Sequence, residues 1–221
     1  METATYDPTG LIAGDYPVTS RSVTIESGQG VLARGTVLGR KSLGSATSAA
    51  KSGGNTGNGT FVLDATTPVL PGAKAGVYTL RCIATETHGG TFRFTDPDGF
   101  LLGDFKIPAG AGNSVTVDND IKGVIADGAT DFAVADGFDI TVAAGAGKYV
   151  KAVAAAGDGS AKPVAILGDD VDATSADRAA PAYFSGEFAA GKMSFGAGHD
   201  ADSVDAAFRD VAAPLFVRKL A

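Results

Sequence analysis

The sequence contains few of the residues on which catalytic, redox or metal sites usually depend. Among 221 residues it has one cysteine, two histidines and no tryptophan. The single Cys82 cannot form a disulfide within the chain, and it has no second thiol with which to hold zinc. We therefore expect neither a disulfide nor a structural metal to hold the fold together, and we expect no cofactor.

Long apolar runs and basic clusters are also missing. No run approaches the roughly 18 apolar residues of a membrane helix, and the opening METATYDPTG lacks the basic and apolar regions of a secretory signal. With 18 basic and 25 acidic residues the chain carries a net charge of −7, and it shows no basic patch for nucleic acid. The sequence predicts a protein that binds neither membranes nor nucleic acids and that stays in the compartment where it is made.

Glycine, in contrast, is abundant, with 31 residues spread between short alternating segments. Such glycines are typical of turns that join short strands. In residues 77–85, for example, Tyr78, Leu80 and Cys82 alternate with polar neighbours, as in a half-buried strand. Similar alternation recurs along the chain. The pattern predicts a mainly β fold of sandwiches or small barrels.

The clearest helical pattern lies near the C-terminus. Val204, Phe208 and Val211 recur there at helical spacing. Asp202 is the expected N-cap, and Pro214 should end or bend the helix. We expect this one C-terminal helix to pack its apolar stripe on a sheet.

Two stretches of small, Gly-rich sequence, residues 42–60 and 143–148, interrupt the pattern. Their composition is typical of flexible linkers. Residues 59–142 between them contain enough alternating strands for an independent β-sandwich of immunoglobulin size. Because domain insertions succeed in exposed loops whose ends lie close together, we expect this sandwich to be inserted into a host domain.

The sequence therefore predicts three parts. Residues 1–20 form an N-terminal arm, residues 21–52 and 148–221 form a discontinuous β-domain, and residues 53–147 form the inserted sandwich. The inserted part carries 11 acidic and 5 basic residues, a net charge of −6, which is most of the charge of the chain. An acidic module repels its own copies and stays solvated, so we expect it to project while the remainder docks on another protein.

Residues that could carry chemistry have simpler interpretations. We interpret His88 and His199 as exposed turn residues, because each stands next to glycine in a turn sequence. No GxSxG elbow supports a catalytic role for either of them. Residues 145–148 lack the first glycine and the Ser/Thr of a phosphate-binding loop. Residues 96–99 and 118–120 offer oxygen ligands for calcium, but they lack the remaining acids of an EF-hand loop and suit hairpin turns. No catalytic, cofactor-binding or metal-binding residue is predicted.

Four segments, LIAGDYP, SGQGVLARGTVLG, PVAIL and APAYFSGEF, occur in this order within residues 11–40 and 148–216. In this order they resemble the lambda-type bacteriophage head (capsid) decoration protein family. The resemblance implies a non-enzymatic homotrimer on the outer surface of the virion. It would be made in the host cytoplasm, and it would stabilise the expanded capsid by bridging major capsid protein subunits. The inserted part resembles an immunoglobulin-like β-sandwich module of phage structural proteins, whose ligand is open.

The resemblance also implies that the N-terminal arm is a principal contact with the shell. The matching stretch is residues 5–18. It contains apolar residues without a periodicity suited to a local core, so we expect them to be buried on a capsid subunit instead. These predicted capsid-binding residues are Tyr6, Pro8, Leu11, Ile12, Tyr16 and Pro17.

A second class of function stays open at this stage. The β-modules could belong to a surface adhesin that binds a host glycan or receptor, and an enzyme is a distant third alternative. Regular density at the three-fold positions of purified particles would separate decoration from adhesion alone.

Overall fold

The computed structural model describes residues 10–219, which divide into two compact units. Within this range unit 1 consists of residues 10–41 and 147–219, and unit 2 consists of Ser42–Ala146. Both units are built mainly from strands, with one α-helix in the described part of the chain, so the expected mainly β fold is confirmed. No helix among residues 10–219 is long and apolar enough to cross a membrane.

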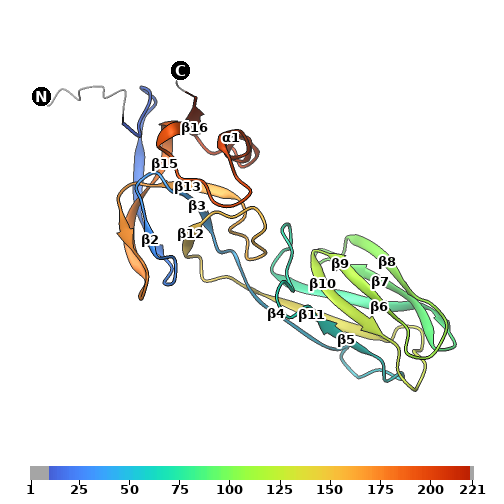
Figure 1. The fold of residues 1–221 in the computed structure, drawn as a ribbon. Helices are drawn as coiled ribbons and strands as arrows, with labels where there is room; N and C mark the ends of the chain where they lie inside the picture. The colour runs from blue at the N-terminus through green and yellow to red at the C-terminus, as the bar shows by residue number, and fades with distance from the viewer. Residues whose placement is uncertain (1–9, 220–221) are drawn as a thin grey trace, which may run out of the picture. The chain divides into compact units, whose positions relative to one another are not determined.

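Unit 1 is a small barrel (Figure 1). Its six-stranded sheet has the order β1-β12-β3-β13-β15-β16, and β1 also pairs with β15, which closes the sheet on itself and leaves β16 outside the closure. Closure pairs β1 on both sides, so that β1 is not an unpaired edge that would attract other chains. The bounds are β1 Thr19–Ile25, β3 Val37–Arg40, β12 Tyr149–Lys151, β13 Pro163–Leu167, β15 Arg178–Ala189 and β16 Leu215–Arg218; β2 Val31–Leu32 and β14 Val171–Asp172 form a separate ribbon.

One close approach of the backbone in unit 1 requires a glycine. A Cβ atom on Gly39 of β3 would lie 1.9 Å from the carbonyl oxygen of Ser160. Two apolar clusters fill unit 1, one around Ile25 and Leu38 and the other around Phe188 and Phe208. The second cluster joins the barrel to the helix.

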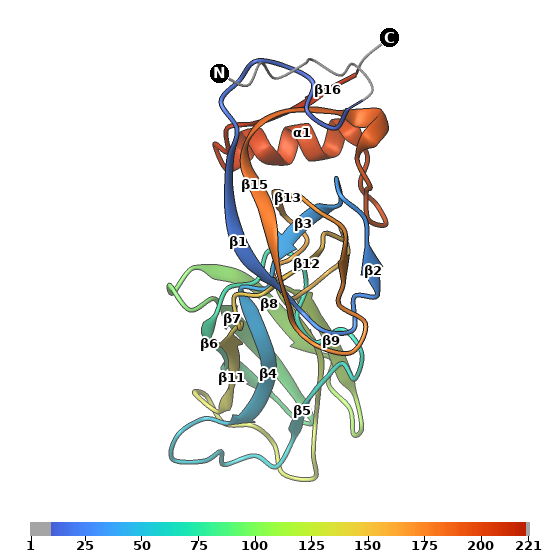
Figure 2. The ribbon, with the colours of Figure 1, turned by 90° about the vertical axis from the view of Figure 1, so that its left-hand side faces the viewer.

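The helix α1 (Ala201–Asp210) packs beside β16 on the barrel (Figure 2). Its N-cap is Asp200, and the expected cap at Asp202 is wrong. Asp200 and Ser203 cap each other: the Ser203 backbone N–H donates to the Asp200 carboxylate, and the Asp200 N–H donates to Ser203 Oγ, both at 2.8 Å. This reciprocal pair starts the helix two residues early. Val204 and Phe208 are fully buried, as their spacing predicts.

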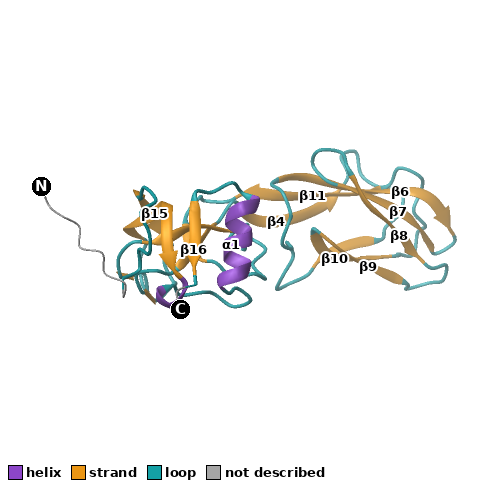
Figure 3. Cartoon of the chain, turned by 90° about the horizontal axis from the view of Figure 1, so that it is seen from above, coloured by secondary structure: helices purple, strands orange, loops and turns teal. Residues whose placement is uncertain are grey.

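Unit 2 is a β-sandwich (Figure 3). A five-stranded sheet of order β4-β11-β6-β7-β8 and a three-stranded sheet of order β5-β10-β9 enclose one apolar cluster, in which Tyr78, Phe92 and Phe94 are fully buried. The bounds are β4 Leu43–Ala50, β5 Thr60–Leu63, β6 Gly76–Glu86, β7 Gly89–Thr95, β8 Leu101–Ile107, β9 Ser114–Asn119, β10 Ile121–Ala126 and β11 Gly137–Ala144.

The first part of the first expected linker is a strand. Residues 43–50 form β4, which pairs antiparallel with β11 and buries Leu43 in the core. Small side chains do not prevent the backbone from pairing, because the hydrogen bonds of a strand need no large residue. The boundary of unit 2 therefore falls at 42–146 and not at 53–147. Its two ends lie side by side, since the Gly145 N–H donates to the Ser42 carbonyl at 2.8 Å.

The strand order of unit 2 does not confirm the immunoglobulin-like interpretation. In that fold the last strand pairs with the next-to-last strand. Here the last strand, β11, lies between β4 and β6, and the next-to-last strand, β10, belongs to the other sheet. Unit 2 is a β-sandwich of a different order.

A buried carboxylate anchors the loop between β4 and β5. Asp136 is 3% exposed and accepts backbone hydrogen bonds from Thr56, Gly57 and Ala133 at 2.9–3.1 Å. Burial raises the pKa of Asp136, but these backbone N–H groups outweigh it and lower the pKa below its usual value. The charged form is therefore part of the fold of unit 2.

Candidate functional site

The segment that follows the expected arm is paired to the body of unit 1. The Ala13 N–H donates to the Glu187 carbonyl at 2.8 Å, and the Ala189 N–H donates to the Leu11 carbonyl at 2.9 Å. Ile12 forms an isolated antiparallel bridge with Phe188. Residues 11–13 thus lie along the end of β15, whose other edge pairs with β16.

Two of the predicted capsid-binding residues are packed within unit 1. Leu11 is 4% exposed and belongs to the cluster of Phe188 and Phe208, and Ile12 is partly buried against the same cluster. The expectation that these two residues lack a local core is wrong. Their partners come from a strand about 175 residues later in the chain, and periodicity within the arm does not reveal such a partner. Tyr6 and Pro8 lie outside the described residues.

Tyr16 and its surroundings form an exposed aromatic surface at the same end of unit 1. Tyr16 is 40% exposed, and its ring centroid lies 5.0 Å from that of Phe216 in β16. The Arg209 guanidinium lies over the Phe216 ring at 4.3 Å from its centroid, a cation–π contact. We call Tyr16, Arg209 and Phe216 the arm-root surface. Neither Arg209 nor Phe216 carries a local sequence signal for this contact.

The chain path at the arm-root surface is fixed by Ser185. Its hydroxyl donates to the carbonyl of Pro17 at 2.8 Å, and the Thr19 N–H donates to Ser185 Oγ at 2.9 Å. Pro17 therefore contributes its backbone to unit 1. Val18, the next residue in the sequence, is 39% exposed and adds apolar surface to this segment.

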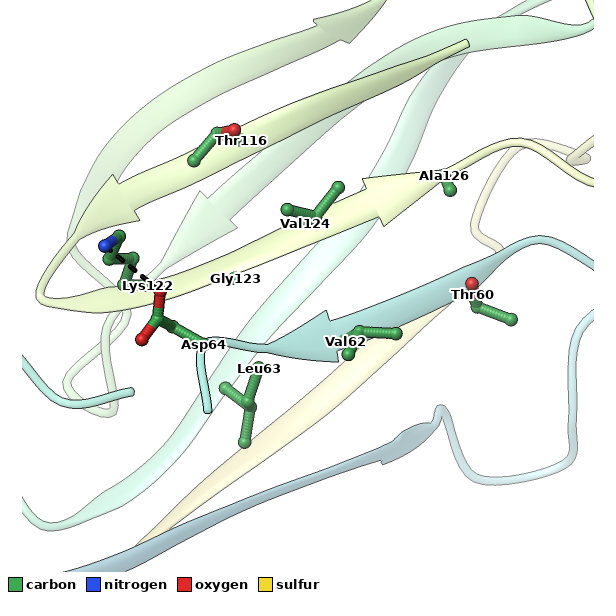
Figure 4. Close-up of a pocket in the computed structure, with 9 residues that line it drawn as sticks. All are labelled: Thr60, Val62, Leu63, Asp64, Thr116, Lys122, Gly123, Val124 and Ala126. Carbon is green, nitrogen blue, oxygen red and sulfur yellow. Dashed lines mark ion pairs between the residues drawn. The ribbon is translucent and has the colours of Figure 1, made fainter. Parts of the chain in front are cut away.

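Unit 2 carries an exposed groove of about 330 Å³ on the outer face of the β5-β10-β9 sheet (Figure 4). Val62 and Val124 are direct cross-strand partners and are 63% and 40% exposed. At one end of the groove the Lys122 ammonium lies 3.0 Å from the Asp64 carboxylate. Backbone N–H groups of the turn after Asp64, together with Lys122, lower the pKa of Asp64 well below its usual range. The groove offers a contact surface with one ion pair already formed.

Both histidines are less exposed than their turn sequences predict. His88 lies in the two-residue turn between β6 and β7, but its Nδ1 is 3.2 Å from the Asp127 carboxylate and 3.5 Å from that of Asp131. His199 is half-buried, and its Nε2 lies 2.9 Å from the carbonyl oxygen of Ala161. Turns do place these residues, but tertiary contacts then partly cover their rings.

The other candidate segments are occupied by internal contacts. The Lys74 ammonium lies 2.8 Å from the Asp96 carboxylate and 2.6 Å from that of Asp98, and its hydrogen bond lowers the pKa of Asp96. Lys148 pairs with Asp177 at 2.8 Å. A lysine thus bridges the two acids of the 96–99 turn, and Lys148 serves an ion pair within unit 1.

Unit 1 is thus a barrel with a docked helix and an exposed aromatic surface, and unit 2 is a β-sandwich that lies between the two segments of unit 1 in the sequence. The family model described as Bacteriophage lambda head decoration protein D matches residues 2–215. The match covers most of the chain, so the protein belongs to this family and is a structural, capsid-associated protein of a phage head. A search of curated proteins and a search of solved structures each found no match.

Proposed function

We propose that the protein forms a homotrimer on the outer surface of the expanded capsid and stabilises it by bridging major capsid protein subunits. Unit 1 and the arm that precedes it make these contacts. The observation that carries the proposal is the arm-root surface. It presents a tyrosine, a phenylalanine and an arginine at the point where residues 11–13 dock on β15.

Aromatic residues and arginine are enriched at the centre of protein interfaces because they bury much surface and lose little conformational freedom. Tyr16 and Phe216 already hold each other in place, so binding would cost little further ordering. The arm then adds Tyr6 and Pro8 to the same contact. Three copies of this contact in one trimer increase the occupancy through multivalency.

Charge supports the assignment of the two units. Unit 2 contains 11 acidic and 6 basic residues and so has a net charge of −5, whereas unit 1 has a net charge of −2. A capsid surface accepts a nearly neutral unit at smaller electrostatic cost, and acidic units repel one another. We propose that unit 2 projects away from the shell. The protein would be made in the host cytoplasm and would add to heads after they expand.

Co-sedimentation with empty expanded capsids of the phage that encodes the protein tests this proposal. Deleting residues 2–9, or changing Tyr16→Ala together with Phe216→Ala, should weaken binding at least about tenfold, which corresponds to roughly 1.4 kcal/mol. Val124→Thr in unit 2 is the matched control and should bind like the unchanged protein. Unchanged binding of both altered proteins would contradict the role of the arm and of the arm-root surface.

Adhesion by unit 2 is the second candidate function, and the groove of Val62 and Val124 favours it. Apolar residues rimmed by polar ones mark contact surfaces. Capsids decorated with a Val62→Asp, Val124→Asp variant should then adhere less to host cells while keeping full decoration. Equal adhesion would remove this candidate.

A further inference from the structure

Three side chains from two connections of unit 2 meet at one place. His88 occupies the turn between β6 and β7, Asp127 directly follows β10, and Asp131 comes four residues later. The backbone holds the acids in position, since the Asp127 N–H donates to the Asn113 carbonyl at 3.0 Å and the His88 N–H donates to Asp131 Oδ1 at 2.9 Å. One ligand atom from each of the three residues lies within 4.8 Å of the others.

Asp127 is incompletely paired at this place. Its side chain is 0% exposed, and Oδ2 lies 3.2 Å from His88 Nδ1. Its other oxygen, Oδ1, is buried and has no hydrogen-bond partner among residues 10–219. Within the same residues neither lysine nor arginine forms an ion pair with it. A buried carboxylate oxygen without a partner is costly, so the Asp127 carboxylate, whose Oδ2 faces His88, is an incompletely paired anion to which a cation can bind.

Two of the three distances between the ligand atoms suit a small tetrahedral ion. His88 Nδ1 lies 3.2 Å from Asp127 Oδ2 and 3.5 Å from Asp131 Oδ1. An ion with bonds of about 2.0–2.1 Å in tetrahedral geometry separates its ligand atoms by about 3.3 Å. The Asp131 oxygen that accepts from the His88 N–H retains a second lone pair for an ion. The ligand atoms of Asp127 and Asp131 lie within 4.8 Å of each other, so the exposed Asp131 side chain can close on the ion to complete three bonds.

We propose that His88, Asp127 and Asp131 bind a divalent transition-metal ion, with Zn²⁺ as its representative. An imidazole nitrogen with two carboxylates suits zinc and its neighbours, whereas Ca²⁺ and Mg²⁺ take oxygen ligands. The two carboxylates neutralise the charge of the ion, and water supplies the fourth ligand. The Asp131 side chain is 45% exposed, which gives the ion a path from solvent.

The bound ion links the β6–β7 hairpin to the segment that follows β10. An ion that binds the folded chain and not the unfolded one stabilises the fold in proportion to its occupancy. It would therefore fasten this end of unit 2, which the single cysteine of the chain cannot do by a disulfide. The competing explanation is a proton on His88 that forms ion pairs with both acids, and the test must separate the two.

The test uses the full chain without a histidine tag, stripped with EDTA. Titration with Zn²⁺ in a calorimeter at pH 7.5, and with Co²⁺ in a visible spectrometer, should show one ion per chain. In scanning calorimetry Zn²⁺ should raise the unfolding temperature of unit 2 by several degrees, and Ca²⁺ and Mg²⁺ should not. His88→Gln and Asp131→Asn should each reduce the affinity at least about tenfold.

The second histidine provides the matched control. His199→Gln should keep one ion per chain at unchanged affinity, because His199 belongs to unit 1. Asp131→Asn keeps the test valid if His88→Gln fails to fold, since the Asp131 side chain is 45% exposed. Absence of Zn²⁺ and Co²⁺ binding by the unchanged chain would overturn the proposal in favour of the protonated histidine. Binding that survives both His88→Gln and Asp131→Asn would place the ion elsewhere and would also overturn it.

Discussion

Replacing Leu11 by alanine separates the folding role of the segment after the arm from its binding role. Leu11 is 4% exposed and packs among Phe188, Phe208 and neighbouring apolar residues of unit 1. Removing a buried leucine side chain leaves a cavity and costs about 2–5 kcal/mol. A loss of about 3 kcal/mol lowers the unfolding temperature of a unit of this size by roughly 10 °C. The unfolding temperature of unit 2 should not change.

Differential scanning calorimetry measures both transitions in one experiment, because the two units have separate cores. Val31→Thr is the control: Val31 is 72% exposed, and its change should cost within about 0.5 kcal/mol. If Leu11→Ala left the unit 1 transition unchanged, Leu11 would not be part of that core. The same reasoning predicts that deletion of residues 2–9 preserves the fold of unit 1, whereas deletion of residues 2–17 does not.

Two further predictions concern unit 2. Replacing residues 42–146 by a short Gly/Ser bridge should leave a folded unit 1, as measured by circular dichroism. Replacing residues 53–147 instead should leave β4 without its partner strand and Leu43 exposed, and should therefore cause aggregation. Equal behaviour of the two deletions would contradict the boundary at Ser42. Because the pKa of Asp136 is lowered in the folded state, its stabilisation is present above its usual value and is lost as the pH falls through the lowered pKa. The unfolding temperature of unit 2 should therefore decrease once the pH drops below about 4. Asp136→Asn should cost about 1–3 kcal/mol of the stability of unit 2 at pH 7 and so lower its unfolding temperature. The same change should reduce the acid dependence of that temperature, and an unaltered pH profile would contradict this role.

Residue spacing within one segment correctly predicted a buried strand and the helix. The alternation of Tyr78, Leu80 and Cys82 marks a strand that is buried as expected. The spacing of Val204 and Phe208 marks the helix, although two nearby aspartates compete for its N-cap. Only the reciprocal bond with Ser203 selects Asp200.

Long-range pairing limited the remaining predictions. Leu11 is buried by β15, and β4 is made a strand by β11, and both partners are far away in the sequence. The lack of local periodicity therefore misread Leu11 as a residue without a core in its own unit, and composition misread β4 as a linker. The cluster of His88 and Asp127 is of the same kind, because 39 residues separate its members and no spacing motif connects them.

Electron cryomicroscopy of empty expanded capsids incubated with the purified protein tests the proposed function most directly. Regular density at the three-fold positions is expected, with unit 1 on the shell, its Tyr16 and Phe216 end against capsid subunits, and unit 2 outside. Capsids that show no added density at a saturating concentration of folded protein, or density in which unit 2 alone contacts the shell, would contradict the account.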